Sequence, residues 1–163
     1  MTRTPETRLW PQLSVRRGRA AVDFYKAAFG AVEDHRVGGT DEHEDVVAQL
    51  SVGDATFWIS DESPAHGNFS PESLDGATTR MLLVVADPAA VLARAAAAGA
   101  TVVQPVEDEH GWQVGRIADP FGHHWEIGTP PGAGHRPAGT TPSRPETDPS
   151  CRTPILQRDW ESE

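Results

Sequence analysis

The side chains best suited to chemistry lie close together near residue 125, in the run GHHWEI. Successive side chains of a strand point to opposite faces, so His124 and Glu126 share a polar face while Trp125 and Ile127 share an apolar one. A histidine beside a carboxylate can act as a general base near neutral pH, and both groups can ligate Zn, Ni, Fe or Mn. His124 and Glu126 are therefore the candidate catalytic pair, and Glu126 is the candidate metal ligand.

An internal repeat determines how such residues are positioned. A shift of 69 residues lays AAVDFYKAAFGA (20–31) on AAVLARAAAAGA (89–100), with seven of twelve positions identical. The same shift superposes further apolar residues and a glycine outside these segments without a gap, which predicts a duplicated unit. Repeat 1 covers about residues 8–60, repeat 2 about 79–130, and a linker (61–78) joins them.

Each repeat has the pattern of one strand, one helix and three further strands. The helices are expected to end at Gly30 and Gly99, because glycine adopts the left-handed conformation that often follows a helix. Asp87 is the expected N-cap of the second helix, with Pro88 as its first residue. The strands are expected near residues 9–15, 32–37, 44–52 and 54–60, and again near 80–86, 101–105, 112–118 and 122–128.

Two βαβββ units, with FYKAAFGA ending the first helix and DPFGHHWEIG (119–128) at the last hairpin, resemble the vicinal-oxygen-chelate superfamily. That superfamily includes glyoxalase I, bleomycin-resistance proteins, fosfomycin-resistance enzymes and extradiol dioxygenases. The resemblance covers about residues 8–130. It implies an α+β domain (1–130) in which the two repeats form one cupped eight-stranded mixed sheet, with helices on the convex face, a ligand cavity on the concave face and usually a homodimer.

Superfamily members that use a metal place His, Gln or Glu at four cavity positions, two in each repeat. Glu126 fits the last position, and the resemblance places Trp10 at the first and Phe57, or a neighbour of it, at the repeat mate of Glu126. The repeat mate of Trp10 is Thr79 or Arg80, depending on a one-residue register. Indole, phenyl and guanidinium groups do not coordinate divalent cations, so the sequence favours a site without a cofactor.

A rearranged metal site is the alternative. His124 and Glu126 point the same way, and Gln12 or His110 would have to approach them to complete a set of ligands for Zn, Ni, Fe or Mn. A lone histidine and glutamate on one strand more often form hydrogen bonds with each other or with water.

The walls of the cavity are predicted from the same alternation. In the first strand Leu13 and Val15 would face the helix, which leaves Gln12 and Ser14 toward the cavity. Aromatic walls with few polar groups suit a flat or hydrophobic ligand. The candidate ligand-binding residues are Trp10, Gln12, Ser14, Phe57, Arg80, Trp112 and Arg116.

Three of the neighbouring residues have a structural alternative. Trp58 and Trp125 are expected in the core on the helix side, and Arg116 is expected to form a salt bridge with one of the many nearby acids rather than to bind an anionic group.

The amino-acid composition limits the kinds of partner that the protein is expected to bind. The chain has 24 acidic and 14 basic residues, a net charge of -10, which repels phosphate backbones and excludes nucleic acid. An acidic surface favours a cationic ligand or confers solubility alone.

The cysteine count and the apolar runs indicate where the protein works. A single cysteine, Cys151, cannot form an intrachain disulfide, and no apolar run has the length of a signal peptide or a membrane helix. We therefore expect a cytoplasmic protein without a membrane partner.

The last part of the chain, 131–163, is rich in proline and glycine and is predicted to lie outside the core. Its final segment, ILQRDWESE, carries Ile155, Leu156 and Trp160, which would either dock on the domain or a second subunit or remain a frayed terminus.

Three functions follow from these patterns. The first is a metal-independent small-molecule-binding protein of the antibiotic-sequestering, bleomycin-resistance-like kind, with a ligand that is aromatic or cationic. The second is a glyoxalase-like lyase or isomerase, or a dioxygenase, with a rearranged metal site that uses Glu126. The third is a regulator or interaction module that docks through ILQRDW.

Overall fold

The computed structural model describes residues 7–41 and 44–132, so the tail and its ILQRDW segment lie outside the described residues. Repeat 1 consists of β1 (Gln12–Val15), α1 (Gly18–Phe29), β2 (Val32–Gly38), β3 (Val46–Val52) and β4 (Ala55–Asp61). Repeat 2 consists of β5 (Arg80–Val84), α3 (Pro88–Ala97), β6 (Thr101–Glu109), β7 (Trp112–Ala118) and β8 (His124–Thr129). The linker contains a 3-10 turn, η1 (Pro64–His66), and a short helix, α2 (Pro71–Leu74). The predicted α+β fold with two βαβββ units is confirmed.

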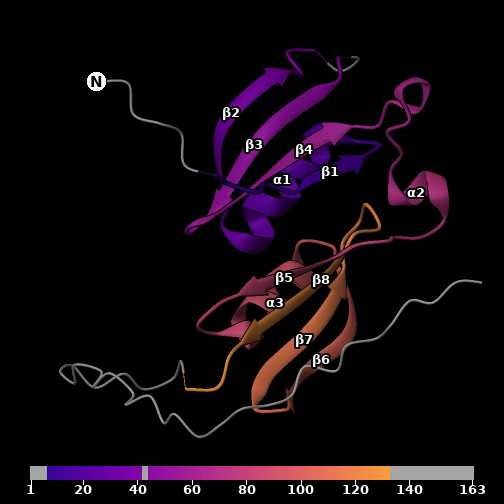
Figure 1. Ribbon diagram of the computed structural model, residues 1–163. Coiled ribbons are helices and arrows are strands. Elements are labelled where there is room, and N and C mark those ends of the chain that lie inside the picture. Colours follow the sequence, from indigo (N-terminus) through magenta and orange to yellow (C-terminus); the bar gives the residue numbers. More distant parts are fainter. Residues whose placement is uncertain (1–6, 42–43, 133–163) are drawn as a thin grey trace, which may run out of the picture.

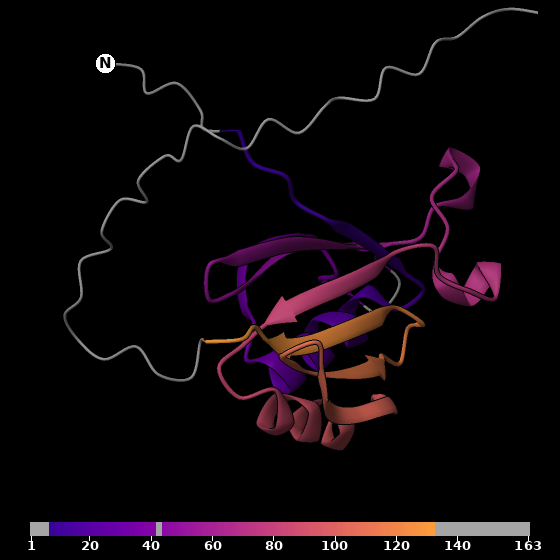
Figure 2. The same cartoon turned by 60° about the horizontal axis from the view of Figure 1, so that its bottom comes forward.

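The eight strands form two adjacent four-stranded mixed sheets, in the orders β1-β4-β3-β2 and β5-β8-β7-β6 (Figure 1). In each sheet the first strand pairs in parallel with the last strand of the repeat, and the remaining pairs are antiparallel. Each long helix packs on one face of its own sheet, and Figure 2 shows α3 below the strands of repeat 2. We call the other face of each sheet its open face.

Helix α1 begins and ends where local chemistry requires. The carboxylate of Asp61 accepts the backbone N–H of Gly18 at 2.8 Å and that of Val46 at 2.7 Å, which ties the start of the helix to the sheet. The helix stops at Gly30, whose φ of 67° is the predicted left-handed cap. Val22 and Tyr25, three residues apart on the helix face that meets the sheet, are fully buried.

Helix α3 follows the predicted capping pattern. The side chain of Asp87 accepts the backbone N–H of Ala90 at 3.0 Å, and Pro88 opens the helix. The chain reverses after the helix at Gly99, where φ is 116°.

A cluster of aromatic rings forms the core between the repeats. Tyr25 of α1 lies 5.3 Å from Phe57 of β4 and 5.6 Å from Trp125 of β8, measured between ring centroids. Phe29, one turn further along α1, lies 4.9 Å from Trp125. Helix α1 therefore buries aromatic side chains against both repeats and holds them together as one body.

Candidate functional site

The candidate catalytic pair lies on the open face of repeat 2, as predicted. His124 and Glu126 are partly exposed, while Trp125 between them is 4% exposed and packs in the core. Arg80 is the strand partner of His124, and its Nη1 lies 2.7 Å from Oε1 of Glu126. The carboxylate of the candidate metal ligand is therefore ion-paired with a guanidinium group from the neighbouring strand.

Arg116 lies opposite Glu126 on the neighbouring strand β7, but its side chain forms hydrogen bonds with another residue. Its Nε and Nη2 donate to Oε1 of Gln104 at 3.1 and 2.5 Å. The salt bridge expected for Arg116 is replaced by this amide, because Gln104 stands opposite it in the β6–β7 ladder.

The donors needed for a rearranged metal site are not brought together within the described chain. Gln12 lies in repeat 1, where its Nε2 donates to Oγ of Ser60 at 3.2 Å, and His110 occupies the β6–β7 turn with φ of 51°. No group of three His, Cys, Asp or Glu residues in residues 7–41 and 44–132 is arranged to hold a metal ion. One ion-paired carboxylate and one imidazole do not fit an ordinary Zn, Ni, Fe or Mn site.

The structure resolves the repeat register and corrects one expectation. In the parallel strand pair of repeat 1, Gln12 lies opposite Trp58, and at the equivalent place in repeat 2, Leu82 lies opposite Glu126. The repeat mate of Glu126 is therefore Trp58 and not Phe57. By the same register the mate of Trp10 is Arg80. Repeat 2 is shorter than repeat 1 by one residue between the first strand and the helix, and by one more between the helix and the last strand. Each slip of one residue exchanges the two faces of a strand.

This register explains two errors. Phe57, predicted to replace a ligand on the concave face, is 6% exposed and points into the aromatic core. Trp58, predicted for the core, shares the open face with Gln12 and lies 6.2 Å from the ring of His35. Trp125 in the core is confirmed.

The open face of repeat 1 is lined by uncharged polar groups. Oγ of Ser14 donates to Asn68 of the linker, and Asn68 also approaches Ser60 at 3.5 Å. Ser14 and Ser60 are 9% and 4% exposed because the linker covers them. Gln12 and Ser14 thus lie on the predicted side of β1.

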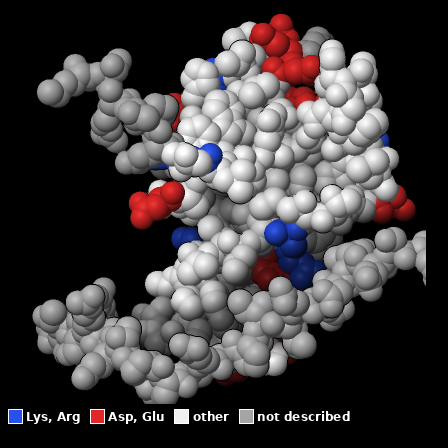
Figure 3. All heavy atoms as spheres, viewed as in Figure 1, with Lys and Arg blue, Asp and Glu red and all other residues white. Residues whose placement is uncertain are grey.

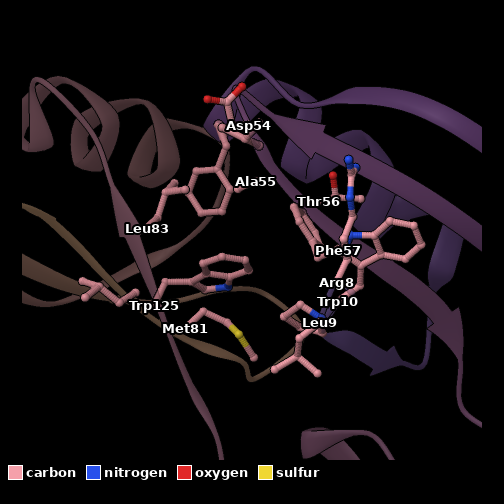
Figure 4. Close-up of a pocket in the computed structure, with 14 residues that line it drawn as sticks. Arg8, Leu9, Trp10, Asp54, Ala55, Thr56, Phe57, Met81, Leu83 and Trp125 are labelled. Atoms are coloured by element: carbon pink, nitrogen blue, oxygen red, sulfur yellow. The ribbon is translucent and has the colours of Figure 1, made fainter. Parts of the chain in front are cut away.

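An aromatic pocket of about 660 Å³ opens where the segment before β1 meets β5 (Figure 4). Trp10 and Phe57, both predicted for ligand binding, contribute to its wall. The wall is completed by four apolar residues, of which Trp125 is the one predicted for the core, namely Phe29, Met81, Leu83 and Trp125. Helical spacing and strand alternation predict burial of such residues, but they do not reveal that two repeats leave a cavity between them.

The charged residues that line this aromatic pocket are Arg8 and Asp54, which have opposite signs. Trp112, the remaining predicted ligand-binding residue, pairs with Glu109 beside the β6–β7 turn and is not part of the pocket wall. The predicted ligand-binding residues are therefore divided among the aromatic pocket, the two open faces and this turn. Figure 3 shows the hollow between the repeats, with both basic and acidic atoms beside it.

No helix among the described residues is long and apolar enough to cross a membrane.

Comparison with known proteins places this geometry in a family. Residues 12–128 match the glyoxalase-like domain. A Mycobacterium tuberculosis protein described as uncharacterized is 41% identical over 129 residues, which are 77% of this chain and 75% of that protein. The X-ray structure of an Arabidopsis thaliana gene product is similar with a TM-score of 0.57 and 31% identity, over 77% of this chain and 98% of that one.

A more distant neighbour has the same fold. The fosfomycin-resistance protein FosX from Listeria monocytogenes, in complex with Mn(II) and sulfate, has a TM-score of 0.57 and 12% identity, over 77% of this chain and 93% of that one. The resemblance to the vicinal-oxygen-chelate superfamily is confirmed, and this chain belongs to the glyoxalase-like domain family within it.

Proposed function

We propose that this protein binds a small, flat organic molecule without a metal, as the antibiotic-sequestering, bleomycin-resistance-like members of the superfamily do. The observation that carries the proposal is the aromatic pocket, whose wall contains Trp10, Phe29, Phe57 and Trp125. Its volume of about 660 Å³ lies within the range of ligand sites for small molecules. Aromatic walls offer a large apolar contact area to a planar ligand at little entropic cost.

The ion pair between Arg80 and Glu126 supports the metal-independent form of the proposal. A guanidinium at 2.7 Å from Oε1 competes with a cation for this carboxylate and lowers its net charge toward an incoming metal. The net charge of -10 adds a preference for cationic over anionic ligands of the same shape. The single cysteine fits the reducing cytoplasm, where we propose that the protein works.

The proposal is tested by titrating two probes against the full chain and following tryptophan fluorescence. The probes are bleomycin and the flat anion 8-anilino-1-naphthalenesulfonate. We expect Trp10→Ala to lower, by about tenfold, the affinity for whichever probe the wild type binds. This corresponds to roughly 1.4 kcal/mol for one lost aromatic contact. Trp112→Ala, outside the pocket, is the matched control and is expected to leave the affinity within about twofold. Absence of binding for both probes, or an equal loss in the two variants, would contradict the proposal.

A second candidate is the glyoxalase-like lyase, isomerase or dioxygenase. The observation in its favour is that His124 and Glu126 share a partly exposed face, where the pair can move protons. Turnover of a superfamily substrate that depends on added metal and is abolished by Glu126→Gln would establish this function in place of simple binding.

A further inference from the structure

A second cavity continues the aromatic pocket along the boundary between the repeats. It measures about 340 Å³ and lies between β1 and the segment that leads from the linker into β5. Pro11 and Met81 line both cavities, so the two form neighbouring parts of one groove. We call this groove the seam. Among the described residues β1 pairs only with β4, and β5 pairs only with β8, so each presents an edge at the boundary.

The backbone bonds of β1 show which of its groups face the seam. The carbonyl of Pro11 accepts the N–H of Trp58 at 2.8 Å, and the carbonyl of Val15 accepts the N–H of Glu62 at 2.7 Å. Odd-numbered residues of β1 therefore bond to β4, and the backbone N–H and C=O of Gln12 point away from β4. The ring of His123, from repeat 2, lies 2.9 Å from the carbonyl of Ser14, as expected for an even-numbered residue that faces the other repeat.

The edge of β5 has the same arrangement. The N–H of Val85 donates to the carbonyl of Gly128 at 2.9 Å, so the odd-numbered residues of this strand bond to β8. The backbone N–H and C=O of Leu82 consequently point away from β8. In Figure 1 the arrows of β1 and β5 point in opposite directions, so an extended chain between them would run parallel to one edge and antiparallel to the other.

We propose that the seam binds an extended peptide-like ligand whose amide groups pair with the backbone of Gln12 and Leu82. This inference rests on the proposed function, because the flat aromatic group that occupies the aromatic pocket is here a side chain of the peptide-like ligand. Strand addition at a sheet edge derives affinity from main-chain hydrogen bonds and specificity from pockets for side chains. A flat ring alone fills the aromatic pocket but leaves the backbone groups of both edges to water.

The walls of the seam define the ligand further. The aromatic pocket takes one large apolar side chain. The second cavity is lined by Ser14, Thr78 and Thr79, which suit a small uncharged polar group, and the linker residues Phe69 and Leu74 close its far side. At about 3.3 Å per residue, the stretch of β1 and its preceding segment along the seam has room for roughly four ligand residues.

The first experiment compares two capped peptides by isothermal titration calorimetry on the full chain. One is acetyl-Val-Trp-Val-Ser-amide, and the other has the same side chains but methylated backbone nitrogens. We expect the first peptide to bind and the methylated one to bind at least about tenfold more weakly, because it has lost its main-chain donors.

The outcomes separate this inference from the proposed function. Equal binding of the two peptides, or no peptide binding while bleomycin or 8-anilino-1-naphthalenesulfonate binds, would overturn the seam proposal and leave small-molecule binding intact. No binding by any of the four probes would overturn both.

The second experiment removes a single outward donor. Leu82→Pro lacks the backbone N–H that faces the seam, while the ladder to β8 uses the neighbouring odd-numbered residues and is kept. Leu82→Ala shortens the same side chain but keeps the N–H. We expect the proline variant to bind the unmethylated peptide at least about tenfold more weakly than the alanine variant. Equal affinities would contradict the proposal.

A hydrogen-exchange measurement on the wild-type chain makes the answer independent of how the proline variant folds. Bound peptide is expected to slow exchange of the Gln12 and Leu82 amides, and to leave Leu13 and Leu83, which face their own sheets, unchanged. Unchanged exchange at Gln12 and Leu82 under saturating peptide would overturn the proposal.

Discussion

One buried carboxylate joins the two repeats at the level of single residues. Asp119, 5% exposed, accepts hydrogen bonds from the Tyr25 hydroxyl at 2.5 Å and from Nε1 of Trp125 at 3.0 Å. It also accepts the backbone N–H groups of Phe121 at 3.0 Å and His123 at 2.9 Å. Burial and then the charge of Asp119 raise the pKa of Tyr25 well above its ordinary value, so the phenol keeps the proton that it donates.

Tyr25→Phe tests this link. The variant leaves Asp119 with three donors instead of four, and we expect the free energy of unfolding to fall by about 1–3 kcal/mol. Urea denaturation at neutral pH measures the change. Ser63→Ala, which removes an exposed hydrogen bond to His66, is the control and is expected to change the free energy by less than about 0.5 kcal/mol. Equal effects of the two substitutions would contradict the role given to Asp119.

The chemistry of single residues was only partly predictable. The alternation of polar and apolar residues placed His124 and Glu126 on one face correctly, because that pattern is local to one strand. The exchange of Phe57 and Trp58 was not predictable, because a difference of one residue between the loops of the two repeats decides the face. The partner of Glu126 also depends on pairing between strands that are distant in sequence.

At the scale of elements, the start of α1 tolerates little change. A Cβ added at Gly18 would lie 2.4 Å from Oδ2 of Asp61 and 3.0 Å from Cβ of Val46. Gly18→Ala is therefore expected to displace the carboxylate that ties the helix to the sheet, at a cost of about 1–3 kcal/mol in unfolding free energy. Gly76→Ala, where nothing lies within 4 Å of the added Cβ, is the matched control. A loss in Gly76→Ala as large as that in Gly18→Ala would rule out the steric explanation.

Glu62, at the start of the linker, connects two later linker residues to Arg16 of repeat 1. Its carboxylate accepts hydrogen bonds from the Ser73 hydroxyl at 2.6 Å, the Ser70 N–H at 2.8 Å and Nε of Arg16 at 3.1 Å. These contacts, the Ser73 hydrogen bond first, lower the pKa of Glu62 to about 2. The linker is thus held as a defined segment rather than as a loose connector.

The lowered pKa of Glu62 predicts that the free energy of unfolding depends on pH. The stabilisation by Glu62 is present above the unfolded-state pKa of about 4.5, and it is lost as pH falls through that value toward about 2. Urea denaturation at pH 7 and pH 3 is expected to show a smaller loss of stability in Glu62→Gln than in the wild type. Parallel losses in the two proteins would show that Glu62 does not contribute.

The elements themselves were predicted well where capping is local. Asp87 and Pro88 begin α3 as expected, Gly30 caps the end of α1, and Gly99 follows the last cap of α3, because caps depend on a few adjacent residues. Strand β6 was predicted to end near residue 105 but continues to Glu109. It is an edge strand whose register shifts twice along β7, and these irregularities accommodate Pro105 and break the alternation used for prediction.

At the scale of the whole molecule, the duplication predicted the two βαβββ units but not the boundary between them. A repeat in the sequence gives each unit its strands, whereas the boundary also depends on how α1 packs against α3 and Trp125 of repeat 2. The seam is therefore a product of tertiary packing.

The homodimer stays a prediction, and exposed apolar side chains on the open faces are its candidate interface. Val37 and Val84 are 58% and 54% exposed, and both lie on open faces. Light scattering on the purified protein is expected to give twice the chain mass of 17.6 kDa. Val37→Asp and Val84→Asp are expected to shift the protein toward the monomer, whereas Leu74→Asp, on the exposed linker, is not. A wild-type monomer at micromolar concentration would refute the dimer.

The central claim is that a small molecule binds in the aromatic pocket without a metal. The most direct test is a titration with 8-anilino-1-naphthalenesulfonate, which does not itself chelate divalent metals, of protein before and after removal of metals with a chelator, with the metal content measured in both samples. The account predicts dissociation constants that agree within about twofold and do not change when Zn(II) or Mn(II) is restored. Binding that disappears with the metal and returns when the metal is added would contradict it.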